Sequence, residues 1–161
     1  MSEGQKSRIL VIDDDEGIRK VVTDALKSEG YSVDTASNGK EAVEKSQTNF
    51  YNLAIIDIRL PDMEGTKLLT SMKETTPEMV KIILTGYPAL QNAVDAVNEG
   101  AHGYLAKPIN MEELLRTVEQ HLKKQSEMKE YNEQKVAQFV ETRIKELQTE
   151  ESDNPKTTKK D

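Results

Sequence analysis

The sequence predicts an α/β domain in which helices cover both faces of a parallel β-sheet. Short apolar runs at residues 9–12, 53–56 and 80–84 alternate with segments whose apolar residues recur at helical spacing. Strands that are buried on both faces form continuous apolar runs, and strands that alternate with helices favour a parallel sheet. A polar residue follows each of the three runs, which indicates where the functional groups gather.

The first half of the domain is predicted to hold two strands, each followed by a helix. After the strand at residues 9–12, a helical pattern continues to Gly30, a typical helix terminator. Residues 31–36 alternate as a second strand. Asn38-Gly39 is a turn signal, and residues 40–46 are compatible with a short helix.

The second half repeats this alternation. The strand at residues 53–56 is followed by chain-breaking residues 61–65 and by an amphipathic helix that ends before Pro77. The strand at residues 80–84 precedes a helix that closes near Gly100. A brief last strand at 103–106 and a helix from Asn110 complete the domain, which gives five strands in all.

Length and composition limit the class of protein. The chain has 161 residues, which suits one domain with an appendage. No window approaches the roughly 18 apolar residues of a membrane span, and the N-terminus lacks a signal-peptide pattern, so we expect a cytoplasmic protein. The absence of Cys excludes disulfides, a thiol nucleophile and a Cys-based zinc site.

The charge distribution disfavours direct nucleic-acid binding. The net charge is −7, with 13 basic and 20 acidic residues up to residue 122 and nine of each from 123 to 161. A protein that neutralises DNA phosphates needs a basic face, and neither part supplies one by count.

Polar residues at the carboxyl ends of the strands are expected to converge, because ligands of such sheets bind at that edge. They are Asp13, Asp14, Asp57, Thr85 and Lys107. Each has an ordinary structural explanation when taken alone, such as helix capping, but the combination favours a site. Carboxylates packed together repel unless a cation shares the site, and an oxygen-only ligand set favours Mg²⁺ or Mn²⁺.

This set of groups suits phosphoryl transfer, which depends mainly on positioning and charge neutralisation. An Asp beside a metal can attack phosphorus and form an aspartyl phosphate. The Lys107 ammonium and the Thr85 hydroxyl could bind further phosphoryl oxygens, and Gly86 would leave the approach open.

The sequence resembles the receiver domains of two-component response regulators, in particular stand-alone, chemotaxis-type receivers, with a C-terminal helical extension. The matching motifs occur in the family's order and spacing over roughly residues 7–122. They are Ile9–Asp14, Asp57, Leu60–Gly65, Leu84–Gly86 and Gly103–Pro108. The resemblance implies a flavodoxin-like, doubly wound fold with strand order 2-1-3-4-5, for which a chemotaxis receiver is a standard example.

The resemblance also implies roles for particular residues. Asp57 would accept a phosphoryl group from a histidine kinase. Mg²⁺ would be held by Asp13, Asp14, Asp57 and the main-chain carbonyl of Arg59. Lys107 would contact the phosphoryl group, and its peptide bond to Pro108 is expected to be cis.

Further roles concern switching and its rate. Thr85 and Tyr104 would form the switch pair, with Tyr104 turning inward on phosphorylation, while Arg59, Tyr87 and Gly86 would tune the reaction. Apart from its own phosphorylation and autodephosphorylation, the chain is not expected to be an enzyme.

Four segments are expected: a flexible N-terminus (1–7), the receiver domain (8–122), a helical extension (123–150) and a disordered tail (151–161). The extension carries a broad apolar face. A strict coiled-coil heptad is interrupted at Gln125, Lys129 and Asn132. Formation of a homodimer, docking of a partner and a solvated helix all remain open.

The tail of about 39 residues is too short for a separate output domain, and the chain has no P-loop or dinucleotide fingerprint. His102 and His121 are interpreted as ordinary residues. The leading hypothesis is a phosphorylation-dependent switch of protein–protein contacts. The alternatives are a phosphorelay intermediate that passes phosphate to a histidine phosphotransfer protein, and a regulator whose tail binds DNA.

Overall fold

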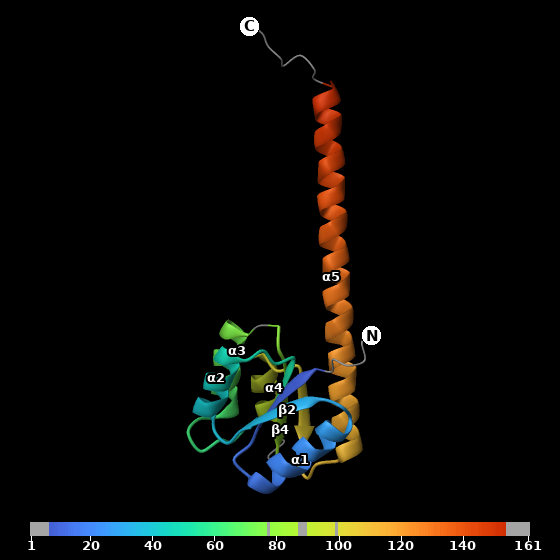
Figure 1. The fold of residues 1–161 in the computed structure, drawn as a ribbon. Coiled ribbons are helices and arrows are strands. Elements are labelled where there is room, and N and C mark those ends of the chain that lie inside the picture. The colour runs from blue at the N-terminus through green and yellow to red at the C-terminus, as the bar shows by residue number, and fades with distance from the viewer. Residues whose placement is uncertain (1–6, 77, 87–89, 99, 154–161) are drawn as a thin grey trace. The chain divides into compact units, whose positions relative to one another are not determined.

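A computed structural model describes residues 7–76, 78–86, 90–98 and 100–153 of the chain (Figure 1). The chain divides into two compact units, Met1–Leu122 and Lys123–Asp161, and each is described by itself below.

The first unit is the predicted α/β domain. Its five parallel strands form one sheet in the order β2-β1-β3-β4-β5, which confirms the fold class and the strand order. The elements are β1 (Arg8–Ile12), α1 (Glu16–Ser28), β2 (Ser32–Ala36), α2 (Gly39–Thr48), β3 (Leu53–Asp57), α3 (Gly65–Thr75), β4 (Val80–Thr85), α4 (Leu90–Asn98), β5 (Gly103–Ala106) and α5 (Met111–Asp153).

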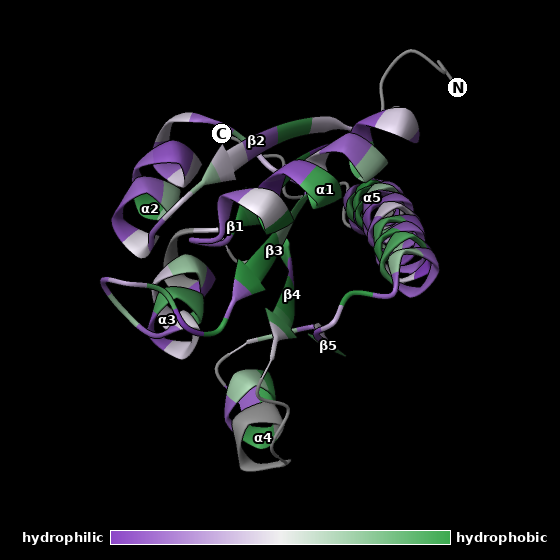
Figure 2. Ribbon diagram, turned by 90° about the horizontal axis from the view of Figure 1, so that it is seen from below, coloured by the Kyte–Doolittle hydropathy of each residue, from purple (hydrophilic) through white to green (hydrophobic). Residues whose placement is uncertain are grey.

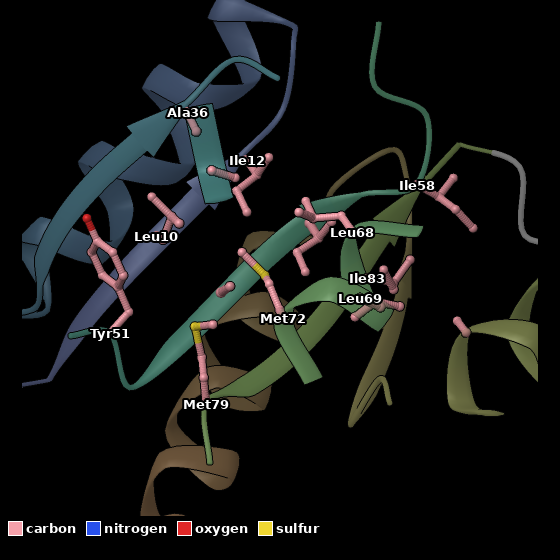
Figure 3. Close-up of a cluster of buried hydrophobic side chains, with 14 residues drawn as sticks. Leu10, Ile12, Ala36, Tyr51, Ile58, Leu68, Leu69, Met72, Met79 and Ile83 are labelled. Carbon is pink, nitrogen blue, oxygen red and sulfur yellow. The ribbon is translucent and has the colours of Figure 1, made fainter. Parts of the chain in front are cut away.

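Two hydrophobic clusters lie on opposite faces of the sheet. One packs α1 and the first part of α5 against the sheet through residues such as Leu26 and Val118. The other packs α2, α3 and α4 against it through residues such as Ala42, Leu69 and Ala96 (Figure 3). In Figure 2 the central strands β3 and β4 are coloured as hydrophobic and the helices lie around them. Burial on both faces explains the continuous apolar runs in the sequence.

Lys81 is an exception within the apolar run of β4. It is only 1% exposed, and its ammonium donates a hydrogen bond to the Thr76 carbonyl at 2.9 Å. Burial, followed by the charge of Lys73, lowers the pKa of Lys81 to about 8. The strand thus buries an amine next to the C-terminus of α3, where a helix presents unpaired carbonyls.

The start of α2 differs from the prediction. Asn38 and Gly39 do not form a free turn, because the Asn38 side chain accepts the main-chain N–H of Glu41 and Gly39 is the first helical residue. Asn is among the preferred N-cap residues for this reason. The helix therefore begins earlier and ends later than residues 40–46. The second strand also begins at Ser32 rather than at residue 31.

The chain ends differ in part from the expected segments. Ser7 is not a free residue of the N-terminus, because its carbonyl accepts the main-chain N–H of Ser32. Helix α5 continues to Asp153, so residues 151–153 of the expected tail are helical. Residues 1–6 and 154–161 lie outside the described residues. Within the described part of the chain, no helix is both long and apolar enough to cross a membrane.

Candidate functional site

The polar residues singled out in the sequence lie together at the carboxyl edge of the sheet. Asp13 follows β1 directly, Asp57 and Thr85 are the last residues of β3 and β4, and Lys107 follows β5. Asp13, Asp57 and Thr85 are 2%, 7% and 0% exposed. Because these strands are parallel, their carboxyl ends bring these side chains to one edge of the sheet, where open α/β sheets bind their ligands.

Three carboxylates form the centre of this site. Asp13, Asp14 and Asp57 each offer an oxygen, and the three oxygens lie within 4.8 Å of one another. Main-chain N–H groups orient the two buried carboxylates. Asp15 donates to Asp13 Oδ1 at 2.9 Å, and Arg59 donates to Asp57 Oδ1 at 3.2 Å. The second oxygen, Oδ2, of each of these two carboxylates faces the Lys107 ammonium.

Lys107 supplies the compensating positive charge. Its Nζ lies 2.9 Å from Asp13 Oδ2 and 3.6 Å from Asp57 Oδ2. The main-chain N–H of Lys107 donates to the Thr85 carbonyl, which ties the end of β5 to the end of β4. The bond to Pro108 is cis, as expected. Burial opposes the charge on Lys107, but its hydrogen bond to Asp13 and the charges of Asp13 and Asp57 outweigh burial and raise the Lys107 pKa.

The environment of Asp57 opposes its ionisation. Burial is the largest effect and raises the pKa of Asp57. The Arg59 N–H and the Lys107 ammonium lower the pKa, whereas the neighbouring charges of Asp13 and Asp14 raise it, and the net change is upward. An added cation would therefore relieve a repulsion that the folded chain itself creates.

The remaining residues of the predicted site have different surroundings. Among the described residues, a Cβ added at Gly86 would first meet Lys107 Cβ at 4.0 Å. Thr85 and Tyr104 lie on the same face of neighbouring strands, since Thr85 pairs with Ala106 and Ile83 with Tyr104. The hydroxyl of Tyr104 is already buried and has no hydrogen-bond partner among the described residues. Tyr87 lies outside the described residues.

The structure adds three residues that the sequence analysis did not single out as contacts of the site. The Arg19 guanidinium on α1 donates to the main-chain carbonyl of Asp13 at 2.8 Å. Gly65 begins α3 so close to β3 that a Cβ would lie 2.8 Å from the Asp57 carbonyl oxygen. Asp62 accepts two main-chain N–H groups of α2. The only sequence signal for Asp62 and Gly65 is their place in the Leu60–Gly65 motif. Asp15 caps the start of α1, because its side chain accepts the Ile18 N–H.

These donors fit a hard divalent cation. Carboxylate oxygens are the ligands that Mg²⁺ and Mn²⁺ prefer, and this set contains no nitrogen or sulfur donor. Asp14 is exposed while Asp13 and Asp57 are buried, so the cluster is open to solvent on one side. A partly open carboxylate site suits Mg²⁺, which keeps several waters. Asp13, Asp14 and Asp57 would hold the ion.

A separate cavity of about 460 Å³ opens at the opposite edge of the sheet. It is lined by residues that precede β3 and β4, among them Phe50, Tyr51 and Met79. None of the carboxylates of the candidate site lines it. This cavity is therefore separate from the candidate site at the carboxyl edge.

Comparison with known proteins agrees with the geometry. Residues 9–119 match the family described as "Response regulator receiver domain". The chain is 34% identical over 119 residues to the transcriptional regulatory protein ZraR of Klebsiella oxytoca, a match that covers 74% of this chain and 27% of that protein. The chain thus spans about a quarter of the length of this relative.

Two solved structures are also similar. One is a CheY-like response regulator receiver domain protein from Methanospirillum hungatei JF-1, with a TM-score of 0.75 and 41% identity, covering 77% of this chain and 99% of that one. The other is the beryllofluoride-activated NtrC4 receiver domain dimer, with a TM-score of 0.71 and 34% identity, covering 73% and 98% of the two chains.

Proposed function

Because the chain belongs to the response regulator receiver family of two-component systems, we propose that it is a switch that a histidine kinase phosphorylates on Asp57. Receivers of this family act as phosphoacceptors rather than as classical enzymes, bind Mg²⁺ at an acidic pocket and interact with histidine kinases. The observation that carries the proposal is the placement of the buried Asp57 carboxylate between two further carboxylates and the Lys107 ammonium.

In the proposed reaction an Asp57 oxygen attacks the phosphorus of a phosphohistidine. The new O–P bond forms as the P–N bond breaks, and the electron pair of that bond returns to the imidazole. A Mg²⁺ ion held by Asp13, Asp14, Asp57 and the Arg59 carbonyl would neutralise charge on the phosphoryl oxygens. The Lys107 ammonium binds another phosphoryl oxygen, and the Thr85 hydroxyl donates to a third.

The proposed switch follows from the charge that phosphorylation adds, about −1.5 to −2. Thr85 moves toward the new phosphoryl group, and Tyr104 responds because it lies on the same face of the neighbouring strand. Because the hydroxyl of Tyr104 is already buried, this ring would not need to travel from solvent in the proposed switch. The surface formed by α4, β5 and the first part of α5 would then change its affinity for a partner. Arg59, Tyr87 and Gly86 are proposed to tune the rate of dephosphorylation.

The test is labelling of the full chain by acetyl phosphate in Mg²⁺, followed by intact mass. We expect one added phosphoryl group on the wild type and none on Asp57→Asn. The matched control is Asp24→Asn, an exposed acidic residue of α1 outside the site, which should still be labelled. Undiminished labelling of Asp57→Asn would overturn the assignment of the phosphoacceptor.

A phosphorelay intermediate is the alternative that the same site supports, since the aspartyl phosphate could pass its phosphoryl group to a histidine phosphotransfer protein. Reversible transfer to such a protein with no change in assembly would favour the relay. DNA binding by the second unit is a further alternative, and a steep salt-sensitive shift of DNA would favour it.

We also propose that the second unit, helix α5 from Lys123 onward, pairs with the same segment of a second copy. Six large apolar side chains of its broad apolar face are between 48% and 70% exposed, namely Met128, Val136, Phe139, Val140, Ile144 and Leu147. Helices in proteins gain most of their stability from packing an apolar face, so these side chains favour a helical partner.

Charge supports a second copy as that partner. Residues 123–135 carry four basic and three acidic groups, and residues 136–153 carry two basic and five acidic groups. An antiparallel pair would place the more positive half of one helix beside the more negative half of the other, as complementary charges select partners and orientation in coiled coils. The similar NtrC4 receiver is a dimer in its beryllofluoride-activated form.

Light scattering tests this assembly. The mass of the full chain is measured with and without Mg²⁺ plus beryllofluoride, and Asp57→Asn serves as the blank. We expect dimers that Val140→Lys disrupts and Gln138→Lys leaves intact, because Gln138 lies two residues from both Val136 and Val140, on the other side of the helix. A monomeric mass under all conditions would overturn pairing with a second copy.

A further inference from the structure

The loop between β3 and α3 leaves the candidate site directly after Asp57 and folds back on itself. The Gly65 N–H donates to the Ile58 carbonyl at 2.7 Å, and the Leu60 N–H donates to the Met63 carbonyl at 3.2 Å. Arg59 and Glu64 form an antiparallel bridge between these two contacts. The loop is therefore a narrow hairpin whose base is the phosphoacceptor strand and whose tip is Pro61 and Asp62.

The tip of this hairpin is fastened to a different helix. Asp62 Oδ1 accepts the Gly39 N–H at 2.8 Å, and Asp62 Oδ2 accepts the Lys40 N–H at 2.9 Å. These are two of the first N–H groups of α2, which have no partner within the helix. The same two hydrogen bonds, with the Gly39 bond as the larger effect, lower the pKa of Asp62, so the carboxylate stays ionised at neutral pH.

Met63 reinforces the contact. A Cβ on Gly39 would lie 2.5 Å from Met63 Sδ, so the thioether rests directly against the helical backbone at the position where Asp62 binds. The neighbouring Asp62 and Met63 therefore contact the same turn of α2. This turn has its own cap as well, because the Asn38 side chain accepts the Glu41 N–H at 2.8 Å.

We propose that Asp62 is a positioning residue of the phosphoryl-transfer site. Its hydrogen bonds to the N-terminus of α2 hold the loop in place, and Arg59 belongs to that loop. The Arg59 N–H orients the Asp57 carboxylate at 3.2 Å, and Arg59 lies three residues before Asp62 in the hairpin. If Asp62 no longer holds the tip, the arm of the hairpin that carries the Arg59 N–H can shift relative to Asp57. The inference rests on the proposed function of the site.

Two variants separate positioning from simple helix capping. Asp62→Ala and Asn38→Ala each remove a cap of α2 and should lower the melting temperature to a similar extent. Only Asp62→Ala should weaken Mn²⁺ binding, measured by electron paramagnetic resonance of the free ion, and slow labelling by acetyl phosphate at saturating Mg²⁺. We expect about a tenfold loss in each, because small misplacements of reacting groups cost rate steeply. Asp62→Asn keeps one acceptor oxygen and should recover part of both losses.

Equal Mn²⁺ affinity and equal labelling rates in Asp62→Ala and Asn38→Ala would overturn the inference and leave Asp62 as a helix cap. If Asp62→Ala does not fold, the comparison of Asp62→Asn with Asn38→Ala decides in the same way. Failure of the proposed function is distinguishable, because a wild type that binds Mn²⁺ but takes no label would refute phosphorylation while the Mn²⁺ comparison still tests the contact of Asp62 with α2.

Discussion

Lys107 and Asp13 form an ion pair at 2.9 Å in which the side chain of Asp13 is only 3% exposed and that of Lys107 is 19% exposed. The same ammonium lies 3.6 Å from Asp57. The Lys107 ammonium therefore reduces the repulsion between the Asp13 and Asp57 carboxylates, as a bound divalent cation would also do. A metal ion held by Asp13, Asp14 and Asp57 would neutralise the same carboxylate charge as Lys107, so the two cations are expected to weaken each other's binding.

Replacing Lys107 by Met tests this competition. Without the ammonium, the three carboxylates lack their compensating charge, and Mg²⁺ should bind about tenfold more tightly because a unit charge a few ångströms away has been removed. Labelling by acetyl phosphate should fall nevertheless, since a phosphoryl oxygen loses its partner. Isothermal titration with Mg²⁺ and intact mass after labelling measure the two effects. Unchanged or weaker Mg²⁺ binding would contradict the competition.

Two glycines near the site are expected to respond differently to the same substitution. A Cβ on Gly65 would lie 2.7 Å from Ile58 Cα and 2.8 Å from the Asp57 carbonyl oxygen, whereas the nearest described neighbour of a Cβ on Gly86 is Lys107 Cβ at 4.0 Å. Gly65→Ala forces backbone apart and should cost about 1–3 kcal/mol of stability. Gly86→Ala should change stability by less than about 0.5 kcal/mol. Urea unfolding compares them, and equal losses would refute the close approach at Gly65.

Much of this fold could be predicted because burial on both faces of a parallel sheet leaves a direct mark on the sequence. The apolar runs of β1 and β3 end at Asp13 and Asp57, so parallel strands bring those carboxylates to one edge, whereas the strand order was predicted from the family resemblance. Lys81 shows the limit of that reasoning. A lysine inside a strand suggests an exposed position, yet the C-terminal carbonyls of α3 supply a buried partner that only the folded chain reveals.

The contacts that orient the site were not predictable in the same way. Asp62 binds α2 across 22 and 23 residues of sequence, and the Arg19 guanidinium reaches the Asp13 carbonyl from the second turn of α1. Both depend on where a loop or helix lies after packing, which periodicity does not encode. The same holds for Asn38, where a turn signal and a helix cap use the same residue type.

The hydroxyl of Tyr104 is expected to cost stability, because it is buried without a hydrogen-bond partner among the described residues. Tyr104→Phe should therefore stabilise the protein by about 1 kcal/mol, the penalty of an unpaired polar group. Tyr51→Phe is the matched comparison. Its hydroxyl donates to Asp34 Oδ2 at 2.6 Å, so its loss should destabilise the protein by about 1–2 kcal/mol. Thermal unfolding of both variants measures the difference, and a destabilised Tyr104→Phe would mean that the hydroxyl has a partner.

Acid is expected to weaken the fold through His102. Burial, followed by the charges of Lys81 and His121, lowers the pKa of His102 from 6.5, and its Nδ1 accepts the Lys81 main-chain N–H at 3.0 Å. Protonation would set a second donor against that N–H. As the pH falls below 6.5, the unfolded chain binds the proton first, so stability is lost on acidification and present above this pH.

His102→Gln removes this titration and should flatten the dependence of unfolding free energy on pH below 6.5, the ordinary value for the imidazole. Urea unfolding of wild type and variant across that range gives the two slopes. The variant also loses the acceptor of the Lys81 N–H, which lowers stability by a similar amount at every pH and leaves the slope unaffected. If the unfolding free energies of the two proteins change with pH in parallel, His102 has the same pKa in the folded and unfolded chains. A constant offset between the two curves does not affect this conclusion.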